Sequence, residues 1–199
     1  MKSMVSQKGS VLLVSLIFLL LLTLVGVSSM NMTSLEEQMA GNFRDHDLAF
    51  QAAEAALLAG EEFVEDTFDI TQAYTSPACS GAICYTSSGT AGLSFNGALT
   101  GPASPVANCD SGTTKEWEDS SIWSDSSKTR ASSGQISGTV ENARYIVEFR
   151  CFMPRDSVNL DPDPDVYAQW SPAFRITAVA SGTSTDSTVM LQSIYKLVN

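Results

Sequence analysis

The stretch that decides the fold is Ser10-Val-Leu-Leu-Val-Ser-Leu-Ile-Phe-Leu-Leu-Leu-Leu-Thr-Leu-Val25. It begins a longer run, from Ser10 to Leu35, that contains no charged side chain. A helix needs about 20 apolar residues to cross the roughly 30 Å hydrocarbon layer of a membrane. The run therefore predicts one membrane-spanning helix near the amino terminus. Lys2 and Lys8 precede it, which predicts a cytoplasmic start and an outward-facing body.

Three kinds of amino-terminal segment share this pattern. A secretory signal would be cut after the apolar run, near the small residues Val27, Ser28 and Ser29. A plain single-span anchor would stay uncut. A prepilin leader would be cut before the run, between Gly9 and Ser10, so that the apolar helix stays in the mature protein.

The sequence beyond the span favours a helix that is kept. The first proline is Pro77, and apolar residues recur every seven positions before it, at Phe43, Phe50, Leu57 and Val64, flanked by Ala49, Ala53, Ala56 and Phe63. Residues at this spacing lie on one stripe of a helix, and most of the acidic residues lie on the other faces. A signal peptide that is discarded has no need to be in phase with the helix after it. We expect one helix over about 10–68.

The carboxyl-terminal region predicts strands. Apolar and polar residues alternate over Ala143–Phe152, Phe174–Ala180 and Val189–Leu197, with β-branched and aromatic enrichment. In the first of these, alternation places Tyr145, Val147, Phe149 and Cys151 on one face. Ser181–Asp186 predicts a hairpin turn between the last two strands. An antiparallel sheet with one apolar face needs a cover, and the stripe of Phe50, Leu57 and Val64 predicts that the helix supplies it. The predicted fold class is α+β.

The middle of the chain predicts loops with a few short strands. Between Thr71 and Asn142, 38 of 72 residues are Gly, Ser, Thr, Asn or Pro, a composition unsuited to long helices. All four cysteines lie beyond the span, at Cys79, Cys84, Cys109 and Cys151. An even count in an oxidising compartment predicts two disulfides. Of the three possible pairings we favour Cys79–Cys84 with Cys109–Cys151, because the first closes a small local loop.

These observations divide the chain into five segments. We expect a leader peptide over 1–9, an apolar stem over 10–35, an amphipathic helix over 36–68, a loop-rich and disulfide-linked region over 69–142, and a β-sheet over 143–199.

Composition argues against several function classes. The chain has 22 acidic and 11 basic side chains, a formal charge of −11, and no basic patch of the kind that binds nucleic acid. His46 is the only histidine, so no serine or cysteine nucleophile can be paired with a second histidine base. We expect no enzymatic activity and no cofactor.

One acidic motif has the opening spacing of a calcium loop. Asp161, Asp163 and Asp165 alternate with prolines, but Val166 stands where the turn glycine belongs and Pro172 where the closing glutamate belongs. The motif is more typical of a stiff, solvated connector. It remains a weak calcium candidate, and we predict no other metal site.

Several segments resemble a known family. Leu35-Glu-Glu-Gln-Met-Ala-Gly-Asn-Phe-Arg-Asp45 and Leu48-Ala-Phe-Gln-Ala-Ala-Glu-Ala-Ala-Leu57 resemble the amino-terminal region of PilX-type minor pilins of the type IV pilus. Phe174–Val179 and Val189–Tyr195 resemble that family's final strands. The likeness is strong over about the first 65 residues and moderate over the last 30.

The resemblance implies a function. It implies cleavage by a prepilin peptidase at Gly9 and Ser10, N-methylation of the new terminus, and a stem held in the inner membrane with the head in the periplasm until assembly. The stem would then insert into a pilus at the cell surface, beside the major pilin and other minor pilins. The implied role is priming of assembly within a tip complex that supports adhesion, twitching motility or DNA uptake, with a possible tip adhesin as a partner.

One position departs from the pilin pattern. Most pilins carry a glutamate as the fifth residue after the leader, where it neutralises a neighbouring subunit's amino terminus, whereas this chain has Val14. The departure suits a subunit at or near the tip, which has no earlier subunit to neutralise.

Two other functions share the same architecture. A tip pseudopilin of a type II secretion system also lacks the stem glutamate, although such subunits commonly carry a large helical insertion that this chain lacks. A single-span anchored periplasmic binding or sensor domain is the third possibility.

Overall fold

A computed structural model of the chain describes residues 10–68, 79–85, 94–95, 99–100, 115–159, 162–163 and 166–198. The chain forms two compact units, Met1–Arg44 and Asp45–Asn199. We call the first the stem and the second the head.

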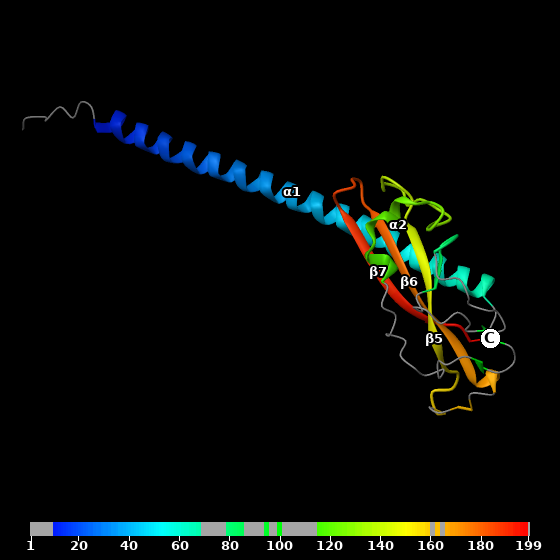
Figure 1. The fold of residues 1–199 in the computed structure, drawn as a ribbon. Coiled ribbons are helices and arrows are strands. Elements are labelled where there is room, and N and C mark those ends of the chain that lie inside the picture. The colour runs from blue at the N-terminus through cyan, green and yellow to red at the C-terminus, as the bar shows by residue number, and fades with distance from the viewer. Residues whose placement is uncertain are drawn as a thin grey trace, which may run out of the picture. The chain divides into compact units, whose positions relative to one another are not determined.

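One helix dominates the amino-terminal part. Helix α1 runs from Ser10 to Thr67 without interruption, 58 residues in all (Figure 1). No proline occurs within it, and leucine and alanine, both strong helix formers, supply many of its positions. The predicted helix is therefore confirmed almost to its last residue.

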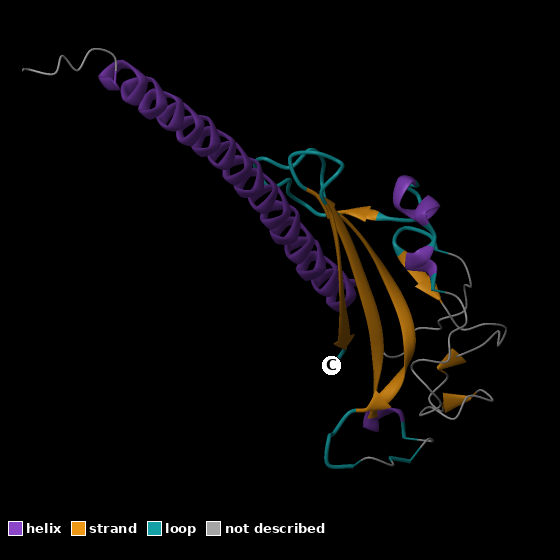
Figure 2. Cartoon of the chain, turned by 90° about the vertical axis from the view of Figure 1, so that its left-hand side faces the viewer, coloured by secondary structure: helices purple, strands orange, loops and turns teal. Residues whose placement is uncertain are grey.

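Within its described residues, the head contains a five-stranded sheet with the order β1-β5-β6-β7, in which β4 also pairs with β5. The three long strands are β5 (Arg144–Pro154), β6 (Trp170–Ser181) and β7 (Thr188–Lys196), and they pair antiparallel (Figures 1 and 2). Strand β4 (Arg130–Ala131) is antiparallel to β5, but β1 (Ile83–Tyr85) is parallel to it. The predicted α+β fold is confirmed, and the sheet is mixed at this edge.

Short elements fill the rest of the described head. Strands β2 (Ser94–Phe95) and β3 (Leu99–Thr100) form a separate antiparallel pair. The 3₁₀ turn η1 (Glu116–Glu118) leads into helix α2 (Ser120–Ser124), and η2 (Tyr167–Gln169) precedes β6. The loop-rich composition of this region accounts for elements of this length.

The main core lies between the head part of α1 and one face of the sheet. Small residues line the helix side, namely Ala49, Ala52, Ala53, Ala56 and Gly60, followed by Val64 and Phe68. Aromatic and aliphatic residues line the sheet side, among them Tyr145, Phe149, Phe174 and Ile176. At Gly60 an added Cβ would lie 2.6 Å from Cγ2 of Ile176 and 3.3 Å from Cδ2 of Tyr145. Small side chains thus allow the helix to approach the sheet closely.

The expected stripe on the helix is wrong in part. Val64 is fully buried and Leu57 packs against the core, but Phe50 is 37% exposed and Phe43 is 72% exposed. The helix meets the sheet along its alanines, which leaves no room for a phenylalanine ring in the centre of the contact. A strict period of seven also drifts around a helix of 3.6 residues per turn.

The first long strand departs from simple alternation. The β5–β6 register shifts between Phe149 and Cys151, a β-bulge. Such a bulge changes which residues face the core, and Phe152 is buried beside Phe149, with ring centroids 5.3 Å apart. The expectation that Cys151 continues the face of Tyr145, Val147 and Phe149 did not allow for this shift.

A second, smaller core lies on the other face of the sheet. Ile146 of β5 packs with Cys84 and Ile122, and Cys79, Trp117 and Trp123 pack against them. The sheet therefore separates α1 on one side from η1 and α2 on the other (Figure 2).

Candidate functional site

The stem carries the apolar surface that the sequence predicts. Large hydrophobic residues from Val11 to Val27 are exposed, and α1 contains the one described segment long and apolar enough to cross a membrane. Its hydroxyl groups bond within the helix, since Oγ of Ser15 donates to the carbonyl oxygen of Leu12 at 2.9 Å and Oγ1 of Thr23 to that of Leu20 at 2.8 Å. A polar group in lipid needs such a partner. The stem surface thus suits lipid or other apolar helices.

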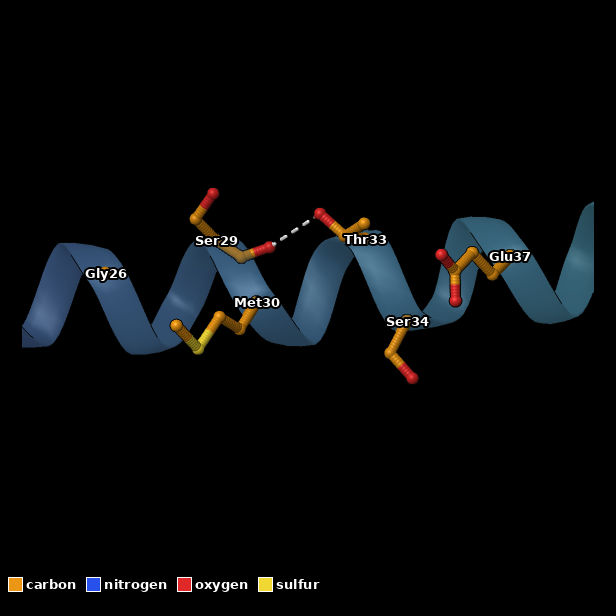
Figure 3. A pocket seen from close by; sticks show the side chains of 6 residues that line it. All are labelled: Gly26, Ser29, Met30, Thr33, Ser34 and Glu37. Carbon is orange, nitrogen blue, oxygen red and sulfur yellow. Dashed lines mark hydrogen bonds between the residues drawn. The ribbon is translucent and has the colours of Figure 1, made fainter.

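The carboxyl-terminal half of the stem helix has a shallow hollow on its surface (Figure 3). It is lined by Gly26, Ser29, Met30, Thr33, Ser34 and Glu37. Oγ1 of Thr33 donates to the carbonyl oxygen of Ser29 at 3.2 Å, which turns that hydroxyl back onto the helix. Small residues at such spacing permit the backbones of membrane helices to approach closely.

The predicted processing site falls at the edge of the described chain. Gly9 lies outside the described residues, and Ser10 is the first residue of α1. Val14, the fifth residue counted from Ser10, lies on the exposed apolar surface of the helix. Cleavage and the role of Val14 therefore remain predictions.

At the start of the head, Asp45 connects α1 to the turn between β6 and β7. Its carboxylate accepts hydrogen bonds from the backbone N–H of Thr183, from Oγ1 of Thr183 at 2.6 Å and from Oγ of Ser184 at 3.2 Å. Gly182 makes this approach possible, because an added Cβ would lie 2.5 Å from the backbone oxygen of Asp45. The bonds from Thr183, followed by those from Ser184, lower the pKa of Asp45. No local pattern predicts this contact, because Asp45 is one of many acidic residues on the helix.

Two acids of α1 contact the inner face of β7. Oγ of Ser193 donates to Oε1 of Glu61 at 3.1 Å, and the hydroxyl of Tyr195 donates to Oε1 of Glu65. The bond to Glu65 raises the pKa of Tyr195 to about 12. These two contacts place carboxylates beside the last strand of the sheet.

A charged pair lies on the other face of the sheet. Glu148 of β5 and Arg175 of β6 are opposite each other, and the guanidinium donates from Nε to Oε2 at 2.5 Å and from Nη2 to Oε1 at 2.8 Å. The Glu148 side chain is fully buried, and that of Arg175 is 13% exposed. The guanidinium carbon also lies 5.9 Å from the centre of the Trp117 ring. Nothing in the alternation pattern predicted that these two residues would be buried.

The cysteines are described in part. Cys79 and Cys84 form a disulfide that closes a five-residue separation, and the Cys84 side chain is buried in the smaller core. Cys151 lies in β5 opposite Ala173, but Cys109 lies outside the described residues. The second disulfide therefore stays a prediction.

The described residues are expected to offer at most a weak metal site. They contain no group of three or more His, Cys, Asp or Glu side chains placed to hold a metal ion. Of the weak calcium candidates, Asp161 and Asp165 lie outside the described residues. The backbone of Asp163 takes part in a turn, because its N–H donates to Oε1 of Gln169 at 3.1 Å and its carbonyl accepts from Nε1 of Trp170 at 3.0 Å. His46 is an exposed helix residue.

Comparison with protein families decides the assignment. Residues 8–58 match the family described as PilX N-terminal, and residues 81–197 match the family described as Type IV pilus assembly protein PilX C-term. The chain belongs to the PilX family of type IV pilus assembly proteins.

Membership of this family makes the chain a minor pilin of type IV pilus assembly, a structural component that interacts with other parts of the pilus. The long apolar helix fits a membrane-anchored pilin. Searches of curated proteins and of solved structures gave no match.

Proposed function

We propose that this PilX-family chain is a minor pilin that is cleaved between Gly9 and Ser10 by the prepilin peptidase and then takes part in priming the pilus, within a complex at its tip. The observation that carries the proposal is the extent of α1. From Ser10, the first described residue, the helix continues to Thr67 without interruption and has a lipid-compatible surface on its stem. Cleavage elsewhere in the apolar run would remove part of this helix.

The same surface supports a proposed location. Before assembly the stem resides in the inner membrane, with the head on the periplasmic side, because exposed leucines are stable in hydrocarbon and the basic leader stays in the cytoplasm. During assembly the stem moves into the fibre, where it packs against the stems of the major pilin and of other minor pilins. Helix packing in both settings relies on close apolar contact and small residues.

Val14 supports a place at or near the tip. An acid at this position in an apolar fibre core would need a positive partner, since a buried unpaired charge is costly. Valine needs none, which suits a subunit with no earlier subunit above it. From this position the head supports adhesion, twitching motility or DNA uptake, with a tip adhesin as a partner.

Mass spectrometry of the mature amino terminus tests the processing step. We expect a start at Ser10 that carries an N-methyl group, and Gly9→Val should leave the leader attached, whereas Ser3→Val should not. A mature start at Met1 or Met30 contradicts the proposal.

Assembly is tested separately from processing. We expect the chain to copurify with sheared pili in a small amount relative to the major pilin, and its deletion to reduce the number of pili. Val14→Glu should alter assembly or tip composition, and Val25→Glu serves as a matched control for placing an acid in the stem. Unchanged assembly and tip composition in the Val14 variant would contradict the role of this position.

A further inference from the structure

In the part of the chain that the structure describes, the outer edge of β7 carries few of the features that normally protect a sheet edge. Among the described residues, β7 pairs with β6 on one side and no strand pairs with its other side. An unpaired strand leaves a row of N–H and C=O groups open, and proteins usually protect it with a proline, a bulge or a charge that points inward. From Thr188 to Lys196 there is no proline, and the β6–β7 register runs without a shift.

The opposite edge is different. There β5 pairs with the short strands β1 and β4. A disulfide joins Cys84, which lies in β1, to Cys79, which precedes that strand. The sheet therefore has one edge covered by two short strands, one of which carries a disulfide cysteine, and one edge formed by a long strand of nine residues.

The two faces of β7 differ in chemistry. On the face away from α1, Met190 is 41% exposed and Ile194 is 66% exposed, with uncharged Gln192 between them. On the face toward α1, Ser193 and Tyr195 bond to Glu61 and Glu65. An apolar outer face and an acidic inner face thus meet at this edge.

Acidic residues recur along the side of α1 that lies next to β7. Glu54, Leu58, Glu61 and Glu65 recur at helical spacing on one stripe, and all four are at least partly exposed. No lysine or arginine occurs from Asp45 to Thr67. The cation at the end of β7 is already engaged, because Nζ of Lys196 donates to the carbonyl oxygens of Pro154 at 2.6 Å and Arg155 at 2.8 Å.

From this arrangement we propose that the edge of β7 binds an extended segment of another protein, in which apolar and basic residues alternate. The segment adds a strand to the sheet through main-chain hydrogen bonds, the mode known as β-augmentation. Side chains of neighbouring strands on one face lie about 5 Å apart. The apolar residues of the segment therefore lie beside Met190 and Ile194, and its basic residues lie on the side of Glu61 and Glu65. The inference concerns the head alone and does not depend on the cleavage or tip position proposed above.

Peptide binding to the full chain tests the occupant. The probe is a fluorescent nine-residue peptide of alternating lysine and valine, measured by anisotropy with the chain in zwitterionic nanodiscs. One control peptide has glutamate in place of lysine, and another has the same composition with the lysines grouped. We expect both controls to bind at least about tenfold more weakly, a difference of about 1.4 kcal/mol.

Variants of the chain locate the site. We expect Ile194→Lys to weaken binding at least about tenfold, because a charge on the outer face opposes the apolar side of the peptide. Glu61→Gln with Glu65→Gln should weaken binding and reduce its dependence on salt. Val158→Lys is the matched control, since Val158 is 86% exposed in the loop after β5 and should leave binding unchanged. Circular dichroism checks that each variant is folded.

Hydrogen exchange adds a readout of the edge itself, since backbone amides of residues 188–196 should exchange more slowly when the alternating peptide is bound. The proposal is overturned if the alternating peptide does not bind, or if all three peptides bind equally. It is also overturned if the Ile194 variant binds as well as the natural chain, or if the peptide slows exchange only at residues of the head outside 188–196. Self-association of the chain that Ile194→Lys abolishes, without peptide binding, would also overturn it, because the occupant would then be a second copy.

Discussion

At Gly60, the approach of α1 to β6 leaves too little room for even a methyl group. A Cβ there would lie 2.6 Å from a carbon of Ile176, a distance that real side chains do not tolerate. At Gly182 the constraint comes from Asp45, whose backbone oxygen and carboxylate occupy the space that a Cβ would need. These two glycines therefore serve close packing between elements rather than a special turn conformation.

The Gly60→Ala variant should be less stable than the natural chain. Alanine favours a helix over glycine by about 1 kcal/mol, but overpacking costs about 1–3 kcal/mol, so we expect a net loss of up to about 2 kcal/mol in the free energy of unfolding. Gly41→Ala is the control, since nothing lies within 4 Å of its added Cβ and it should gain helix stability. Chemical denaturation in detergent measures both. Equal stabilisation by the two changes would contradict close packing at Gly60.

Asp45→Asn should change how stability depends on pH. Hydrogen bonds, first those from Thr183, lower the pKa of Asp45 in the folded state. The stabilisation is fully present above the ordinary aspartate pKa of about 4, and it is lost as the pH falls through the lower folded-state pKa. We expect the melting temperature of the variant to be below that of the natural chain at neutral pH, with a gap that closes in acid.

Asp47→Asn is the control for this measurement, because Asp47 accepts a hydrogen bond from Gln51 one turn along its own helix and does not reach the β6–β7 turn in the described contacts. A gap for Asp45→Asn that stays constant between neutral and acidic pH would argue against the role of its carboxylate.

Among the elements, β5 and β6 are joined by a buried charge pair as well as by backbone hydrogen bonds. Glu148 and Arg175 are almost entirely removed from water, and Trp117 of η1 lies over the guanidinium. Within a pair of this kind each charge depends on the other, because an unpaired charge in a low-dielectric interior is costly.

Removing one member of this pair should destabilise the head strongly. We expect Glu148→Ala to cost about 3–5 kcal/mol, whereas the double change Glu148→Leu with Arg175→Met should cost clearly less, because no charge is left unpaired. Denaturant unfolding followed by tryptophan fluorescence measures the difference. A double variant as unstable as the single one would show that the pair acts through packing alone.

Sequence patterns predicted the elements better than the contacts between them. Helix α1 follows from the absence of proline within it, and strands β5, β6 and β7 follow from alternation, both of which are local properties of the chain. The alanines that flank the predicted stripe are buried as expected, but the exposure of Phe50, the burial of Glu148 and the contact of Asp45 with Thr183 depend on residues far apart in sequence. A periodic pattern selects a face, but the spacing between packed elements decides which residues fit there.

For the whole molecule, the stem should depend on hydrocarbon. Its exposed leucines have no cover within the described stem. Leu16→Arg with Leu20→Arg should cost about 2.5–3.5 kcal/mol per charge near the centre of the span, so we expect the variant to be lost from the membrane pellet after carbonate extraction. Ser34→Arg with Gln38→Arg, at the polar end of the stem, is the control and should remain in the pellet. Equal retention of both would contradict a membrane span at this position.

The sheet buries its two faces in separate cores, one against α1 and one beneath η1, α2 and the disulfide. Substitutions under one layer need not disturb the other. The covering layer formed by η1 and α2 can therefore be replaced independently of the helix. A foreign segment that supplies apolar residues above Ile146 and an aromatic ring above Arg175 should leave the alanine contact between α1 and the sheet intact.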